Sequence, residues 1–142
     1  MPLHPLLRPV LAVSLGAIPG ALSRFLLERY IGSYLPTHFP LETLIVNVSG
    51  CFLMGVIVPL GLARTFRLHP DLRLLLTTGF LGSYTTFSSY ELDVERLFAD
   101  RDTTGELLYW FGSTTLGLLA LEVGTRLAVH CLTWWEGEDA AP

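Results

Sequence analysis

The chain has 142 residues, of which 51% are hydrophobic and only 15% are charged, and its formal net charge is −4 at pH 7. Soluble domains usually carry about a quarter of charged residues, so this composition argues against a soluble domain and favours a membrane protein. The nine basic residues are all arginines scattered along the chain, which excludes the clustered basic surface that nucleic-acid binding needs.

Four segments of the chain are apolar enough to cross a membrane as helices. A helix needs about 20 mostly apolar residues to cross about 30 Å of hydrocarbon. Residues 43–63 carry no charge over that length, and the other three segments become long enough when a charged residue at one end is included. The sequence therefore predicts an all-α membrane protein with a single domain over residues 1–142. We expect its four transmembrane helices at roughly residues 7–30, 43–63, 71–98 and 105–130.

Polar side chains recur within the second and fourth predicted helices. Asn47 lies near the middle of the second helix, and Tyr109, Ser113 and Gly117 share one face of the fourth because they are spaced four residues apart. A hydrogen bond between helices is the simplest role for an intramembrane Asn, and the stripe of the fourth helix fits either a packing seam or a polar track.

The third segment contains a run of glycine, hydroxyl and aromatic residues, 82–90, inside an apolar stretch. Lipid offers no water to the backbone, so such a run must face protein or a water-filled path, and residues that break the apolar rule are candidates for function. Gly79, Gly82 and the hydroxyl-rich run predict that the third helix is broken around residues 83–86. The break would free backbone carbonyls, and two breaks meeting on a dimer axis would form an oxygen cage for a hard monovalent cation.

The aromatic residues of this run suggest an anion path. Phe87 and Tyr90 are three residues apart, so their rings lie on one side of the helix. Packing is the simpler interpretation, but the positive edge of an aromatic ring also suits an anion. Ring edges together with amide and hydroxyl donors would replace the water shell of a small anion without a fixed cation. Conduction needs such weak, multiple sites.

Two cysteines, Cys51 and Cys131, fall in different predicted helices. Thiols in apolar surroundings are most often small packing residues, and the chain has no CxxC spacing typical of a metal or redox site. We therefore expect neither a disulfide nor a cysteine-bound metal.

The distribution of arginines predicts how the chain inserts. With four transmembrane helices, five arginines fall on the side of the two termini and four on the other side. The first group is Arg8, Arg64, Arg67, Arg73 and Arg126, and the second is Arg24, Arg29, Arg96 and Arg101. Orientation follows the imbalance between the two sides, so this small difference favours dual topology and an antiparallel dimer whose axis lies in the membrane plane. A single dominant loop would instead fix one orientation.

Three motifs resemble those of the CrcB/Fluc family of fluoride channels. The first is the Gly-rich stretch 16–24, which ends in Arg24. The second is 43–55, which matches Thr-x-x-x-Asn-x-x-Gly-x-x-x-x-Gly, and the third is 79–90, which is similar to the family's Gly-rich Thr-Thr-Phe-Ser-Thr-Phe run. The resemblance implies a small four-helix channel in the cell (inner) membrane that works as an antiparallel dual-topology dimer. Such a channel would export fluoride passively and protect the cell from it.

The resemblance also implies roles for particular residues. Asn47 would be an anion-facing donor, with Thr43 one turn away. Phe87 would be the first ring of the family's phenylalanine box, with Tyr90 in the second position. Arg24 would lie near the pore entrance. The polar track would consist of Ser88, Ser89, Tyr109 and Ser113. The backbone carbonyls of Gly82 and Thr85 from both subunits would hold a central sodium ion.

Some positions depart from the family pattern. Tyr90 stands where the second Phe is expected, Ser83-Tyr84 replaces a small apolar pair, and Gly117 stands where the track continues with a hydroxyl. Glu122 and Arg126 are one turn apart in the fourth helix, and we expect an ion pair between them. Such departures fit a homodimer as well as one half of a heterodimer with a related chain.

Other functions remain as alternatives at this point. A proton-coupled small multidrug exporter has a similar size and topology but needs a membrane-embedded Glu, and Glu122 is the candidate. A membrane scaffold would use the polar residues for packing alone. An enzyme is not expected, because no nucleophile, base and orienting group converge at a predictable site.

Overall fold

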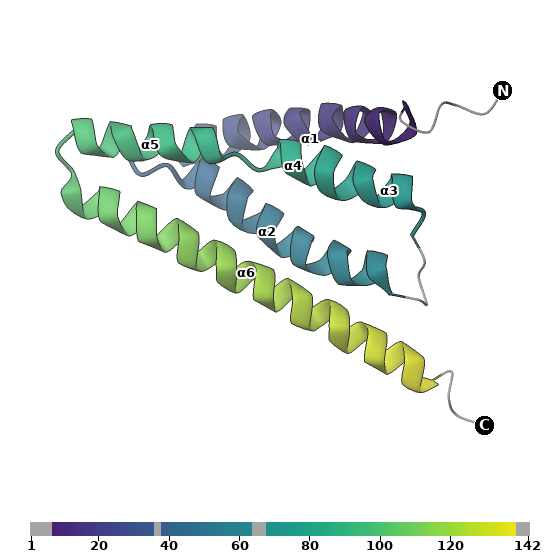
Figure 1. Cartoon of the computed structure of the whole chain (residues 1–142). Helices are drawn as coiled ribbons and strands as arrows, with labels where there is room; N and C mark the ends of the chain where they lie inside the picture. The colour runs from purple at the N-terminus through teal and green to yellow at the C-terminus, as the bar shows by residue number, and fades with distance from the viewer. Residues whose placement is uncertain (1–6, 36–37, 64–67, 139–142) are drawn as a thin grey trace.

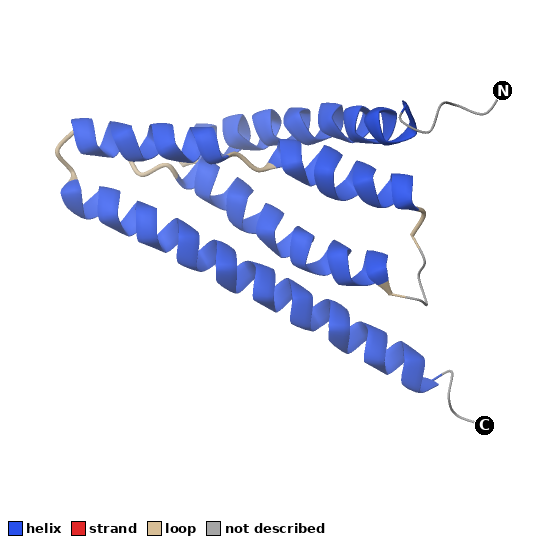
Figure 2. Ribbon diagram, in the orientation of Figure 1, coloured by secondary structure: helices blue, strands red, loops and turns tan. Residues whose placement is uncertain are grey.

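The computed structural model describes residues 7–35, 38–63 and 68–138, and within these residues it contains helices and no strands (Figure 2). The predicted all-α fold class is therefore confirmed. The helices in chain order are α1 (Leu7–Tyr34), α2 (Leu41–Leu62), α3 (Pro70–Leu74), the π-helical segment η1 (Leu75–Leu81), α4 (Gly82–Tyr84), α5 (Phe87–Ala99) and α6 (Thr103–Glu138).

Three of the helices are long and apolar enough to cross a membrane: Leu7–Tyr34, Leu41–Leu62 and Thr103–Trp135. The outer helices are longer than their expected spans, since α1 continues past residue 30 and α6 past residue 130. The expected ends followed the length of the apolar stretch, whereas a helix continues until a breaker stops it. For α1 that breaker is Pro36 in the sequence, because the residue before a proline is disfavoured in the α conformation.

The third predicted helix is interrupted, as its sequence indicates. Thr85 and Thr86 have extended backbones, with φ/ψ of −79°/155° and −145°/119°, between α4 and α5. The break is narrower than the predicted range of residues 83–86, because Ser83 and Tyr84 are still helical. α3, η1, α4 and α5 thus form one bent segment. The four segments α1, α2, α3–α5 and α6 run in alternating directions along one long axis, so the start of α1 and the end of α6 lie at the same end (Figure 1).

Glycines allow the helices to pack at very short distances. A methyl group at Gly124 of α6 would collide with the carbonyl of Phe52 on α2, and one at Gly55 of α2 would collide with the carbonyl of Leu121 on α6. Gly16 of α1 faces η1 in the same way, at the carbonyl of Leu75. Small residues are the usual means of bringing helices together in lipid, where hydrophobic burial gives no advantage.

The interior of the protomer is small. Val46, Leu81 and Tyr84 form one buried cluster, and Tyr90, Leu97 and Tyr109 form another. Large apolar side chains of α1 and α6 point outward instead; Ile18 is 69% exposed and Leu118 is 62% exposed. An apolar outer surface of this extent suits lipid or a partner subunit rather than water.

Candidate functional site

The break in the third segment is held by a side chain from α2. Asn47 Nδ2 donates a hydrogen bond to the Thr86 carbonyl at 2.9 Å, and the Thr86 N–H donates to Asn47 Oδ1 at 2.8 Å. The amide thus satisfies both backbone groups of Thr86 at the point where the helix stops. A primary amide has two N–H donors, so the second N–H of Asn47 is not used by Thr86.

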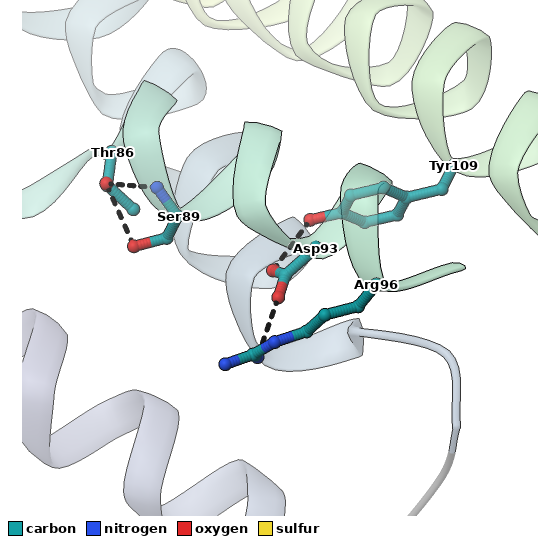
Figure 3. Close-up of polar contacts among 5 residues, drawn as sticks. All are labelled: Thr86, Ser89, Asp93, Arg96 and Tyr109. Carbon is teal, nitrogen blue, oxygen red and sulfur yellow. Dashed lines mark hydrogen bonds and ion pairs between the residues drawn. The ribbon is translucent and has the colours of Figure 1, made fainter. Parts of the chain in front are cut away.

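The carbonyls of Gly82 and Thr85 lose the amide donors that a continuous helix would give them. In an α-helix each carbonyl accepts from the N–H four residues later. The N–H of Thr86 donates to Asn47 instead. The N–H of Ser89 donates to Thr86 Oγ1 at 3.2 Å (Figure 3). The break therefore releases two carbonyl oxygens from helical hydrogen bonding, and oxygen is the ligand that hard cations prefer.

A pocket of about 270 Å³ opens beside this break. α2, α5, α6 and the break itself all contribute to its wall, which carries no formally charged side chain at pH 7. The lining residues are Asn47, Cys51, Thr85, Thr86, Phe87, Tyr90, Ser113 and Thr114.

The structure brings several of the predicted site residues together in this pocket. Asn47, Phe87, Tyr90 and Ser113 come from three helices, and all of them line it. Ser113 Oγ is buried and has no hydrogen-bond partner in the described part of the chain. A buried hydroxyl without a partner is uncommon. The pocket therefore offers a free donor to whatever enters it.

The aromatic residues form a row beside the pocket. The ring of Tyr90 lies 5.7 Å from that of Phe87 and 5.4 Å from that of Tyr109, between ring centroids. The Tyr90 hydroxyl donates to the carbonyl of Trp110 on α6 at 3.0 Å. This departure from the family pattern therefore ties α5 to α6 through the hydroxyl group. Phe87 is 74% exposed on the single protomer.

Beyond Tyr90, the row ends at a buried carboxylate that the sequence analysis missed. Asp93 Oδ2 accepts a hydrogen bond from the Tyr109 hydroxyl at 3.3 Å, and its Oδ1 lies 3.3 Å from Arg96 Nη1 (Figure 3). Thr43, which is also buried, is a second hydrogen-bond partner of the Tyr109 hydroxyl. Asp93 follows Tyr90 by three residues, so helical spacing could have placed it on the same face.

A second, more polar pocket of about 240 Å³ lies next to Asp93 at this end of the molecule. His38, Glu42 and Arg96 are among the residues that line it. Tyr90 lines the first pocket and Asp93 the second, one helical turn apart. The polar groups thus extend from the break toward the ends of α2 and α5.

Other predicted site residues lie outside the first pocket. Ser88 is exposed, and its hydroxyl lies 3.3 Å from Thr86 Oγ1, whereas the Ser89 hydroxyl accepts from Thr86 Oγ1 at 3.1 Å. Both serines therefore contact the cap of α5. Arg24 is a half-buried residue of α1, and it is not among the residues that line either pocket.

Two departures from the family pattern have simple structural explanations. The ring of Tyr84 packs beside Gly50, and its hydroxyl shares a 2.8 Å hydrogen bond with Ser49, so α2 accommodates the larger side chain. The predicted ion pair in α6 is present, with Arg126 Nε 2.7 Å from Glu122 Oε1. Of the nine arginines used to predict topology, Arg64 and Arg67 lie outside the described residues.

These features define a class of protein: a small, all-helical, multi-pass membrane protein with an uncharged polar pocket beside a broken helix. Residues 11–125 match the family described as CrcB-like protein, Camphor Resistance (CrcB), and the chain belongs to this family. With its three apolar helices, this membership makes it an integral protein of the cell membrane.

Curated relatives resemble the chain over most of its length. The fluoride-specific ion channel FluC of Trichormus variabilis is 44% identical over 128 residues, which are 90% of this chain and 93% of the relative. The protein of the same name from a Synechococcus species is 46% identical over 124 residues, which are 87% of this chain and 95% of the relative. That of Stutzerimonas stutzeri is 41% identical over 123 residues, which are 87% of this chain and 98% of the relative.

Proposed function

We propose that this protein is a fluoride-selective channel, and not an enzyme, that lets the ion leave the cell down its electrochemical gradient. The observation that carries the proposal is the uncharged pocket beside the break, which Asn47, Phe87, Tyr90 and Ser113 line together. The similarity to relatives named fluoride-specific ion channels points to the same ion.

The chemistry of the pocket suits a small anion that must not be held tightly. The second N–H of Asn47 and the unpaired hydroxyl of Ser113 are donors that can replace water around fluoride. The wall has no Arg or Lys, which would slow release of the ion. A larger anion such as chloride would be excluded by a narrow path with few donors. Export through such a path protects the cell from fluoride.

The working form in this proposal is an antiparallel, dual-topology dimer of four-span protomers. Support for a fourth span comes from the bent segment α3–α5, which runs the full length of the bundle between α2 and α6 in the chain (Figure 1). The high exposure of Phe87 supports a partner surface at the break, because a large apolar ring is usually covered. The nearly even arginine count allows both orientations in the membrane.

A sodium ion at the dimer centre completes this assembly. Its ligands would be the carbonyl oxygens of Gly82 and Thr85 from each of two protomers. The redirected amides of Thr86 and Ser89 support this, since they leave those oxygens without helical donors. When bound, the ion would screen these carbonyl dipoles and join the two breaks.

The test is efflux of fluoride from liposomes that contain only this chain, measured with a fluoride electrode and with valinomycin to balance charge. We expect rapid release of fluoride and none of chloride in matched vesicles. Release would establish a channel and a competent homodimer together. If folded, dimeric protein released no fluoride, the next experiment would add a related chain as heterodimer partner. If the two chains together also released no fluoride, the proposal of a channel would be contradicted. Proton-driven export of a cationic drug would instead favour the exporter.

A further inference from the structure

We infer that Cys51 is a pathway residue, whose thiol supplies the polar group that α6 lacks at Gly117. The inference rests on the proposed function, because it adds a residue to the wall of the same pocket. It gives a role to a cysteine for which the sequence indicates only packing.

The position of Cys51 follows from the geometry of α2. It lies four residues after Asn47, so the two side chains are stacked on one helix face, and both line the pocket. Its thiol is free. The side chain therefore continues the line of polar groups that begins at the break.

The opposite wall leaves room for this thiol. Ser113 and Gly117 are one turn apart on α6, and a Cβ atom built at Gly117 would lie 3.4 Å from Cys51 Sγ. Ser113 provides a hydroxyl at its level, whereas Gly117 provides no side chain. Beside Gly117, the sulfur of Cys51 is therefore the side-chain group that lies within contact distance of the position where a side chain of α6 would begin.

An independent observation indicates that this part of the pocket receives a guest. Ser113 Oγ exposes less than 1 Å² and lacks a hydrogen-bond partner among the described residues, although it lines the pocket with Cys51. A buried hydroxyl left in that state destabilises the protein unless a water or an ion bonds to it. The chemical class that fits is a small hydrogen-bond acceptor. The S–H of Cys51 is a weak donor that would contact such a guest as it passes from Ser113.

The chain offers a clean test because its two cysteines can be studied separately. Cys131 is exposed on α6, outside the residues that line the pocket. C131S keeps Cys51 as the sole thiol, and C51S keeps Cys131 as the matched control. Each is reconstituted and treated with methyl methanethiosulfonate. The cysteine thiolate attacks the reagent's methylthio sulfur, forms a mixed disulfide and releases methanesulfinate, while the thiol proton goes to the buffer. Intact-mass spectrometry counts the methylthio groups added.

We expect treatment to lower fluoride efflux through C131S by about tenfold or more, equivalent to about 1.4 kcal/mol on the barrier. The efflux through C51S, relative to its own untreated sample, should not change. Fluoride present during labelling should slow modification of Cys51 more than chloride does, which a packing role would not produce. Labelled C131S with unchanged efflux would overturn the inference, and so would a Cys51 that the reagent never reaches. If untreated C131S released no fluoride, either alone or together with a related partner chain, the proposed function would fall, and this inference with it.

A second experiment moves the polar group to the other helix. G117S alone should reduce efflux, because its hydroxymethyl group would lie in contact with Cys51 Sγ and narrow this part of the pocket. The double variant C51A/G117S removes the sulfur and restores a hydroxyl from α6, so we expect its efflux to exceed that of G117S. If the double variant elutes as the same oligomer but its efflux does not exceed that of G117S, a hydroxyl at position 117 does not replace the thiol of Cys51, and the inference is contradicted.

Discussion

The bent segment and α6 both line the pocket, and the break in the bent segment differs from α6 in how its polar groups find partners. In α6 the hydroxyls of Thr114, Thr125 and Thr133 donate to carbonyls of their own helix at 2.9–3.0 Å. In the bent segment, both backbone groups of Thr86 depend on the side chain of Asn47 from α2. Removing a hydroxyl that bonds within its own helix should change the protein little. Removing the Asn47 side chain, which bonds the backbone of Thr86 from another helix, should change it much more. The comparison predicts which positions are sensitive to substitution.

The largest effect is expected for Asn47→Asp. The carboxylate cannot donate to the Thr86 carbonyl, and it adds a negative charge to a path for anions. Fluoride efflux should fall by about 100-fold, or about 2.7 kcal/mol on the barrier. Efflux from liposomes measures it, with dimer stability in detergent followed in parallel.

The matched control for this substitution is Thr125→Val on α6. It removes a hydroxyl that bonds only within its helix, so we expect a change in stability within about 0.5 kcal/mol and unaltered efflux. Equal effects of the two variants would contradict the contrast between the segments. Unchanged efflux in Asn47→Asp would remove Asn47 from the mechanism.

The sequence predicts the existence of the break better than its position. Glycines and hydroxyls at 82–90 indicate an interruption, because lipid does not satisfy a free backbone. The break is limited to Thr85 and Thr86 because Asn47 bonds the backbone of Thr86, and these two residues are 39 positions apart in the chain. Helical spacing grouped Phe87 with Tyr90, and the two rings do lie side by side. It also placed Ser113 on one face of α6 with Tyr109, and Ser113 lines the pocket. It could not show that α2 brings Cys51 to the same wall.

The burial of Asp93 is a second feature that the local sequence does not reveal. A local reading assigns a carboxylate in an acidic stretch to solvent, and only the contact with Tyr109 of α6 reveals that it is enclosed. For Asn47 the sequence predicts a hydrogen bond between helices, and the structure shows it as a bond to the Thr86 carbonyl that uses one of the two N–H groups of Asn47. The family resemblance implies that Asn47 also faces an anion. The role toward an anion stays a prediction. Packing between distant segments decides these details, and no local pattern encodes it.

Glycines bring α6 very close to α2, so a glycine substitution tests this packing separately from the hydrogen bonds of α6. A methyl group in Gly124→Ala would collide with the Phe52 carbonyl, whereas one at Gly112, on the same helix, would meet nothing within 4 Å. We expect Gly124→Ala to destabilise the protein by about 1–3 kcal/mol. Gly112→Ala should be neutral or stabilising by up to about 1 kcal/mol, through helix propensity. Thermal unfolding in detergent compares the two, and equal midpoints would contradict close packing of α6 on α2.

The smallest effect is expected for Tyr90→Phe, where the two segments do share a hydrogen bond. The Tyr90 hydroxyl donates to the Trp110 carbonyl, which also accepts from Thr114 Oγ1 at 3.0 Å. The carbonyl therefore keeps a partner when the hydroxyl is lost, and the cost should be about 1 kcal/mol or less. The ring stays in the wall of the pocket, so efflux should change far less than in Asn47→Asp. A tenfold loss of efflux with the fold intact would show that the hydroxyl contacts the ion. The contrast between α6, where threonine hydroxyls bond within the helix, and the break, which depends on Asn47, would then not account for Tyr90.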